Sequence, residues 1–166
     1  LSTVQELYKT LIENEMDRKG LLVALGGGVV GDITGFAAAT YLRGISFIQI
    51  PTTLLSQSDS SVGGKTGVDF DGYKNMVGAF CMPKLVYMNV STLSTMDERD
   101  YLSGMGEVVK HGLIRDKKFF DWLKINHEKI FVFKRRHIHG VFRLCGKPQT
   151  KHSCLLYTSD AADDKA

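Results

Sequence analysis

Residues 21–41 read LLVALGGGVVGDITGFAAATY, and this stretch decides the class of fold. Its first five residues form a short apolar run, which is typical of a buried strand in a parallel sheet. Consecutive glycines then turn the chain, and residues 32–42 have the composition of a helix. Gly26, Gly28 and Gly31 satisfy the pattern G-x-G-x-x-G between strand and helix, where backbone amides can approach a phosphate closely. The stretch therefore indicates a phosphate-binding α/β domain, although a tight structural turn can use the same glycines for packing alone.

The neighbouring segments continue the alternation of helices and strands. Residues 3–17 are predicted to form an amphipathic helix that Thr3 and Glu6 open with a capping box. Asp71-Gly72 marks a hairpin between two strands. Further strands are predicted at residues 45–50, 65–70, 74–80 and 85–90, and a polar, glycine-rich loop at residues 52–64. This order predicts an α/β fold with a Rossmann-like, mostly parallel sheet.

The pattern becomes helical near residue 95. Thr95 and Glu98 form a second capping box before a helix at residues 96–111, and Asp116 caps the helix that follows. We therefore expect an α/β domain at residues 1–94 and the start of an α-helical domain at residues 95–131. Because Leu1 is not a start methionine, we expect the chain to begin inside a longer one.

Residues 132–166 show neither a helical nor a strand period. Their end, CLLYTSDAADD, resembles a translated sequencing adapter, so this tail is predicted to be non-native sequence from a frameshift or adapter read-through. The net charge of +3 hides a split, because residues 1–130 sum to −1 and the basic excess belongs to the tail. That distribution does not indicate a nucleic-acid surface. Histidine and cysteine in the tail, namely His137, His139, His152 and Cys154, are predicted not to form a metal site.

The composition indicates the class of protein and its cellular compartment. Hydrophobic residues make up 43% and charged residues 23% of the chain, as in an ordinary soluble protein. No apolar run has the length of a membrane span, and three cysteines make no disulfide framework. These features predict a cytoplasmic protein with no membrane partner.

Five short blocks of sequence follow one another along residues 20–115. They are GGGVVGD at residues 26–32, PTTLLSQ at 51–57, DSSVGGKT at 59–66, KN at 74–75 and GEVVK at 106–110. In their order and spacing the blocks resemble those of the 3-dehydroquinate synthase family. The family's two histidine metal ligands, which belong to its helical domain, have no matching motif here.

The resemblance implies an NAD- and divalent-metal-dependent lyase of the shikimate pathway, which serves aromatic amino acid biosynthesis. It implies that residues 1–94 are an NAD-binding α/β domain lacking its N-terminal part, and that residues 95–131 begin the helical substrate and metal-binding domain, so that the fold is truncated at both ends. Such an enzyme converts 3-deoxy-D-arabino-heptulosonate 7-phosphate, a phosphorylated seven-carbon keto-acid sugar, to 3-dehydroquinate and releases phosphate. The parent enzyme would be a homodimer, and we expect this stretch alone to be inactive. Two alternatives stay open: another sugar-phosphate cyclase or glycerol-type dehydrogenase of the same fold, and a fragment that only binds nucleotide.

The resemblance also implies roles for individual residues. Glu107 would bind the metal, as a ligand of Zn²⁺ or Co²⁺. The residues that would act on the substrate are Asp59, Lys65, Asn75 and Lys110. The residues that would bind NAD are Gly27, Gly28, Val29, Val30, Gly31, Asp32, Thr52, Thr53, Leu55, Asp59, Lys65, Lys74, Thr92, Leu93, Ser94 and Thr95.

The spacing of Glu107 and Lys110 supports their pairing, because residues three apart share one face of a helix. Both side chains would then point into a cleft between the two domains. His111 stands four residues after Glu107 and could chelate the same ion. We favour a packed or solvent-bonded His111, because the family varies at this position.

Overall fold

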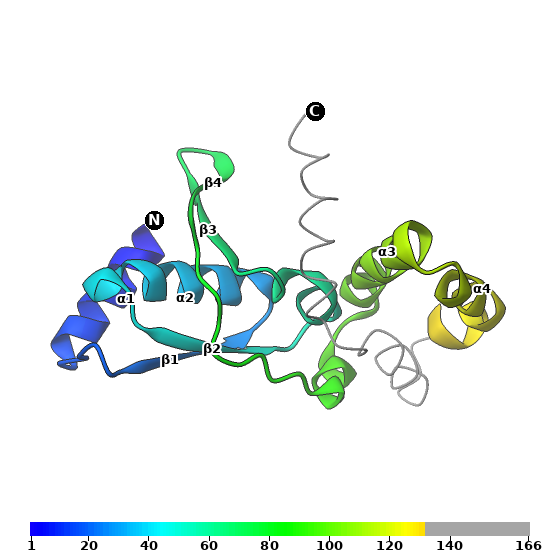
Figure 1. Cartoon of the computed structure of the whole chain (residues 1–166), viewed down its shortest axis with the longest axis horizontal. Coiled ribbons are helices and arrows are strands. Elements are labelled where there is room, and N and C mark those ends of the chain that lie inside the picture. The colour runs from blue at the N-terminus through cyan, green and yellow to red at the C-terminus, as the bar shows by residue number, and fades with distance from the viewer. Residues whose placement is uncertain (132–166) are drawn as a thin grey trace. The chain divides into compact units, whose positions relative to one another are not determined.

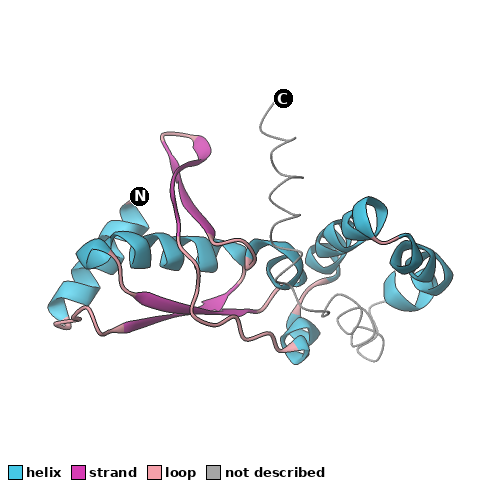
Figure 2. Ribbon diagram, in the orientation of Figure 1, coloured by secondary structure: helices cyan, strands magenta, loops and turns pink. Residues whose placement is uncertain are grey.

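The computed structural model describes residues 1–131, and the predictions made for residues 132–166 lie outside the described part. Packing divides the chain into two units. The first unit is Leu1–Thr52 with Gly64–Asn89, and the second is Thr53–Gly63 with the chain from Val90 onward. The predicted domain boundary after residue 94 stays a prediction. Figure 2 shows strands in the first unit and helices with connecting loops in the second.

The first unit is a mixed α/β structure (Figure 1). Its elements are α1 (Ser2–Glu13), β1 (Leu21–Gly26), α2 (Gly28–Thr40), β2 (Ser46–Pro51), β3 (Lys65–Phe70) and β4 (Tyr73–Phe80). β1 and β2 pair in parallel, as predicted, with Leu21 opposite Ser46 and Gly26 opposite Pro51. β3 and β4 form the predicted antiparallel hairpin around Asp71-Gly72. Both turn residues have positive φ, at 49° and 82°, which is the conformation that a tight hairpin turn requires.

Helix α2 packs against β1, β2 and β3, and α1 packs against α2. The core between them contains Ala38 and Phe47 on one side and Phe36 and Val68 on the other. The prediction that β1 is a wholly buried strand is wrong, because α2 covers only one face. Side chains on the other face are exposed, namely Leu21, Val23 and Leu25.

Three further local predictions for this unit are wrong. Helix α1 ends at Glu13 and has no side-chain cap at its start, so Thr3 and Glu6 make no capping box. Residues 85–90 form a single parallel bridge, between Val86 and Gln49, in place of a strand. Only a few backbone bonds hold that segment against β2, such as the Tyr87 N–H to the Gln49 carbonyl at 2.8 Å.

The described part of the second unit contains two short helical turns and two helices. A short π-helical turn spans Ser56–Ser60, a 3₁₀ turn spans Val90–Thr95, and α3 (Glu98–Arg115) and α4 (Lys117–Phe131) follow. The prediction of a loop at residues 52–64 is therefore wrong for residues 54–60, which are helical, and is confirmed for residues 61–64, which form turns and bends. Thr53 and Ser56 explain the difference, because each backbone N–H bonds the other's hydroxyl oxygen at 3.2 Å, as in a capping box.

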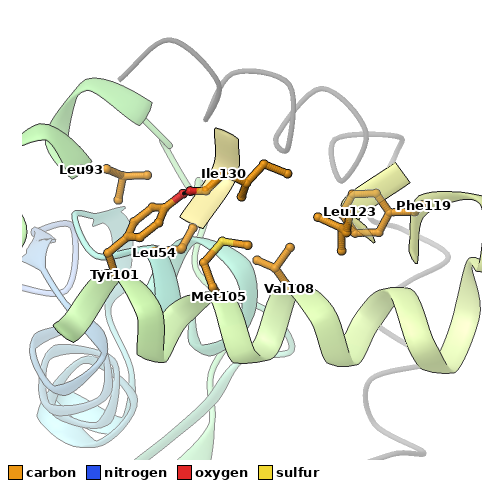
Figure 3. Packing of buried hydrophobic residues seen from close by; sticks show 8 residues of the cluster. All are labelled: Leu54, Leu93, Tyr101, Met105, Val108, Phe119, Leu123 and Ile130. Carbon is orange, nitrogen blue, oxygen red and sulfur yellow. Dashed lines mark hydrogen bonds between the residues drawn. The ribbon is translucent and has the colours of Figure 1, made fainter. Parts of the chain in front are cut away.

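Buried apolar side chains from Leu54, the 3₁₀ turn and both helices of the second unit form one cluster (Figure 3). The cluster comprises Leu54, Leu93, Tyr101, Met105, Val108, Phe119, Leu123 and Ile130. The Tyr101 hydroxyl donates to the Ile130 carbonyl at 3.0 Å and so ties α3 to α4. This packing fixes α3 against the turn that carries Leu54.

The two helices begin at aspartates. Asp97 caps α3, since its carboxylate accepts the Asp100 N–H at 2.8 Å, and the predicted Thr95 cap is wrong. Asp116 caps α4 as predicted, by accepting the Phe119 N–H at 3.0 Å. None of the helices described within residues 1–131 has the length and apolar content that crossing a membrane requires.

Candidate functional site

The glycine turn begins helix α2 earlier than the sequence predicted. Gly27 is the N-cap, and α2 starts at Gly28 in place of residue 32. The first turn therefore consists of Gly28 to Gly31, and its leading backbone N–H groups have no partner within the helix. No side chain caps this end among residues 1–131, and no acidic residue lies in the first turn. Such an end attracts an anion such as a phosphate.

Two of the glycines have packing reasons for their identity. A Cβ on Gly26 would lie 2.7 Å from a methyl carbon of Val30, inside the same turn. A Cβ on Gly31 would lie 2.8 Å from the side-chain nitrogen of Gln49, which is buried in β2. The glycines thus let α2 begin directly above the sheet.

Asp32 on α2 interacts electrostatically with Lys74 of the hairpin. Burial raises the pKa of the Asp32 carboxyl from 3.8 to about 6, and the charge of Lys74 lowers this pKa in part. Lys74 stands on β4, so the fold brings together Asp32 and Lys74, two of the predicted cofactor-binding residues.

The hairpin carries the other predicted residues of the first unit. Lys65 begins β3, and Lys74 and Asn75 are adjacent on β4. Asn75 has a positive φ of 55°, which few residues other than glycine and asparagine adopt. Its N–H donates to the Asp69 carboxylate at 2.8 Å, beside an irregularity in the register between Val68 and Phe70. This bond holds the unusual backbone in place.

The segment after β2 carries predicted cofactor-binding residues in both units. The Thr52 N–H donates to the Gly26 carbonyl at 2.9 Å, which continues the parallel pairing toward the glycine turn. In the second unit, Thr53 helps to open the π-helical turn, and Leu55 is exposed. The side-chain amide of Gln57 donates to the Thr92 hydroxyl at 3.1 Å. That bond joins the turn to the 3₁₀ segment that contains Thr92, Leu93, Ser94 and Thr95.

Metal-ligating side chains gather in the second unit. Asp59, Glu107 and His111 each offer a ligand atom, and these atoms lie within 4.8 Å of one another. Glu107 and His111 come from α3, and Asp59 comes from the π-helical turn. Sequence reasoning gave a role to Asp59 and Glu107 but set His111 aside. The spacing of four residues from Glu107 was the signal that could have included it.

Lys110 contacts Glu107 directly. The Lys110 ammonium nitrogen lies 2.5 Å from Oε2 of Glu107, and both side chains are mostly shielded, at 33% and 26% exposure. The expected sharing of a helix face is therefore confirmed. A half-buried ion pair of this kind holds the carboxylate in one orientation.

The predicted site residues are divided between the two units. The first unit holds Gly27, Gly28, Val29, Val30, Gly31, Asp32, Thr52, Lys65, Lys74 and Asn75. The second holds Thr53, Leu55, Asp59, Thr92, Leu93, Ser94, Thr95, Glu107 and Lys110. Each half is locally organised, and a joint cleft between the halves stays a prediction.

Known proteins resemble this chain in sequence. The family described as 3-dehydroquinate synthase N-terminal matches residues 1–103. The 3-dehydroquinate synthase of Acetivibrio thermocellus is 62% identical over 130 residues, which are 78% of this chain and 36% of that protein. The chain spans little more than a third of the length of the curated relatives it matches.

Solved structures resemble it in fold. A 2-epi-5-epi-valiolone synthase from Streptomyces hygroscopicus subsp. jinggangensis 5008, with NAD⁺ and Zn²⁺ bound, is 27% identical with a TM-score of 0.81. That match covers 98% of this chain and 44% of the synthase. A 2-deoxy-scyllo-inosose synthase complexed with carbaglucose-6-phosphate, NAD⁺ and Co²⁺ is 32% identical with a TM-score of 0.74. That match covers 87% of this chain and 40% of the synthase.

Proposed function

Because this chain belongs to the 3-dehydroquinate synthase family, we propose that it is part of an enzyme that makes 3-dehydroquinate. The reaction would start from 3-deoxy-D-arabino-heptulosonate 7-phosphate and release phosphate, which makes the enzyme a carbon–oxygen lyase of the shikimate pathway. The observation that carries the proposal is the gathering of Asp59, Glu107 and His111, with Lys110 on Glu107, inside a chain of this family. The proposal includes a cytoplasmic, homodimeric parent enzyme, on the family resemblance.

The first unit would hold NAD at the start of α2. Its uncapped amides, from Gly28 onward, would bond the diphosphate, because the helix dipole favours negative charge at this end. Asp32 and Lys74, which lie close enough to interact, would border the cofactor. Bound NAD⁺ would accept hydride from a secondary alcohol of the substrate and later return it.

The second unit would hold the metal on Glu107. The residues fit such an ion, because carboxylates and imidazole are donors that Zn²⁺ and Co²⁺ accept. The divalent ion would polarise the oxygen of the alcohol that is oxidised. Related synthases are solved with Zn²⁺ or Co²⁺ bound, which supports the same ions here.

Lysine side chains would bind the anionic ends of the substrate. Lys110 and Lys65 carry positive charges that would offset those of phosphate and carboxylate. Asn75 would donate a hydrogen bond from the hairpin, where its backbone is held by Asp69. Asp59 would orient the reacting part of the substrate from the π-helical turn.

Other sugar-phosphate cyclases form the second candidate, because two of them resemble the fold closely. Substrate choice would separate them from a 3-dehydroquinate synthase. We would therefore replace the matching stretch of the 62% identical relative with residues 1–131 of this chain. The chimera is expected to release phosphate from the heptulosonate phosphate and to leave glucose 6-phosphate unchanged. Turnover of glucose 6-phosphate alone would contradict the proposal.

Glu107→Gln in the chimera tests the metal role. We expect loss of metal-dependent turnover with retention of NAD binding, measured by titration calorimetry. Glu98→Gln, at the exposed start of the same helix, is the matched control and should retain activity. Undiminished activity of Glu107→Gln would refute the ligand assignment. The 166-residue chain alone is expected to show no turnover.

A further inference from the structure

One buried polar side chain lies directly against the first turn of α2. Gln49 stands on β2, opposite Ala24 of β1, and it is only 6% exposed. We propose that Gln49 is a positioning residue for the diphosphate of NAD, which strengthens anion binding by the amides of α2 through the dipole of its carboxamide. This inference rests on the proposed binding of NAD by the first unit, and it adds a residue that lies outside the five sequence blocks.

The carboxamide contacts α2 at Gly31, where the helix has no side chain. A Cβ on Gly31 would lie 2.8 Å from Nε2 of Gln49 and 3.6 Å from its carbonyl carbon Cδ, whereas Oε1 is more than 4 Å from that point. The carboxamide therefore presents its N–H groups, the positive end of its dipole, to the first turn. Glycine at position 31 permits this approach.

The oxygen end of the same carboxamide has no hydrogen-bond partner among the described residues. Oε1 of Gln49 is shielded from solvent and unpaired. Buried polar atoms are almost always paired, so an exception costs stability and calls for a functional reason. The neighbouring residues Ala24 and Phe47 are apolar and buried, so an apolar side chain would suit position 49 at least as well for packing.

Strand pairing does not supply that reason. The Gln49 N–H donates to the Leu85 carbonyl at 2.9 Å, and the Gln49 carbonyl accepts the Tyr87 N–H at 2.8 Å. These are bonds of the backbone, and any residue except proline could make both of them. The glutamine side chain therefore needs an explanation of its own, and its contact with α2 offers one.

The carboxamide dipole adds to the dipole of the helix. The amides at the start of α2, from Gly28 onward, have no side-chain cap and no acid in the first turn, so this end carries partial positive charge. The N–H groups of Gln49 add partial positive charge at the same end, in a buried position where screening by water is weak. A diphosphate should therefore bind more tightly above glutamine than above an apolar side chain of the same size.

Gln49→Met in the chimera separates this role from packing. Methionine has a similar length but lacks both the carboxamide dipole and the unpaired oxygen. We expect the urea midpoint of unfolding to rise, while the affinity for NAD, measured by calorimetry, falls about fivefold. ADP carries a diphosphate and should lose affinity by a similar factor. Adenosine carries none and should lose no affinity.

Thr66→Val is the matched control. Thr66 is as buried as Gln49 and also lies against a glycine of α2, Gly35, but its hydroxyl has a partner, because it donates to the Ala79 carbonyl at 2.8 Å. This variant should lower the urea midpoint and leave the ratio of the NAD affinity to the adenosine affinity unchanged.

Several results with Gln49→Met would overturn the proposal, namely unchanged NAD affinity, equal losses for ADP and adenosine, a lowered urea midpoint, or failure to fold. Each of them would assign the side chain to packing. The unsubstituted chimera is measured first. If it binds no NAD, the proposed role of the first unit fails together with this inference. If it binds NAD and Gln49→Met binds NAD equally well, the proposed function stands and this inference alone is refuted.

Discussion

Helices α2 and α3 begin in opposite ways. Helix α2 starts at Gly27, with no side-chain cap and no acid in its first turn among the described residues. Helix α3 starts at Asp97, whose carboxylate occupies the amino end, and Glu98 and Asp100 follow in its first turn. The amino end of α2 is therefore available to an external anion, whereas α3 uses its flank, where Glu107, Lys110 and His111 stand.

The difference corresponds to two ways in which a helix can bind a ligand. The proposed site on α2 would use backbone amides, so it requires an end without a side-chain cap. The proposed site on α3 would use side chains on the flank of the helix. Both helices contain a glycine at a close contact, Gly35 against Thr66 and Phe47 in the first unit and Gly104 against Leu54 and Leu55 in the second.

Gly104→Ala should have the largest effect. Its methyl group would overlap the Leu55 backbone nitrogen at 2.8 Å, and backbone cannot turn away as a side chain can. We expect a loss of about 3 kcal/mol in the free energy of unfolding, measured in urea.

Gly106→Ala is the control for that variant, because nothing lies within 4 Å of its added Cβ. Helix propensity predicts a gain of about 1 kcal/mol there. Equal stability of the two variants would show that contact with the turn does not position α3.

Gly27→Asp makes the start of α2 resemble that of α3. Gly27 has φ −77° and ψ −169°, which any residue can adopt, so the fold should tolerate aspartate. The new carboxylate would cap the first turn and repel the diphosphate. We expect NAD affinity of the chimera to fall by about a hundredfold, with thermal stability kept or slightly raised. Unchanged affinity in calorimetry would mean that α2 does not bind the diphosphate.

Substitution of Asp32 tests whether burial of its carboxylate destabilises the first unit. Its pKa is raised to about 6 by burial, so between about pH 4 and pH 6 the folded chain binds more protons than the unfolded chain. Stability should therefore fall as pH rises through this window, and the penalty is fully present above it. Because the side chain is partly exposed, Asp32→Asn should add only about 1 kcal/mol at neutral pH.

The same substitution should add nothing at about pH 4, where Asp32 is protonated in the folded chain. Urea midpoints at the two pH values measure the difference. Asp71→Asn, in the exposed hairpin turn, removes a carboxylate without burial and serves as the control. A gain at both pH values would contradict burial as the cause.

Asp97→Ala should have the smallest effect. Losing the bond to the Asp100 N–H would cost about 0.5 to 1 kcal/mol of stability at the exposed start of α3. Thr95→Ala, at the cap that the sequence favoured, should cost less, since Thr95 only donates to the Thr92 carbonyl. A larger loss from Thr95→Ala in thermal melting would reverse this assignment.

The sequence was sufficient where a signal is local. Asp71-Gly72 predicted the hairpin because few residues accept its backbone angles, and the apolar run before Gly26 predicted a parallel strand. Helix starts were harder, because Thr95 and Asp97 both have an acid three residues later. Which of the two residues caps α3 depends on the backbone conformation, and Asp97 is the N-cap in the structure.

The π-helical turn shows what local signals cannot supply. Ser58, Ser60 and Gly63 favoured a loop, yet Leu54 and Gln57 are buried by residues that are distant in the sequence. The pairing of Asp59 with His111 depends on that packing across 52 positions. Sequence spacing supported the pairing of Glu107 and Lys110, which share a helix, whereas Asp59 on the distant turn was included only through the family resemblance.

The exposed face of β1 has a practical consequence for anyone who purifies this chain. Leu21, Val23 and Leu25 present alternate apolar side chains along one strand, at 47%, 53% and 62% exposure. An exposed apolar strip of this kind favours self-association, which should increase with protein concentration. Self-association would then set the highest protein concentration that a titration can use. Dilute samples and light scattering before each measurement are the sensible precautions.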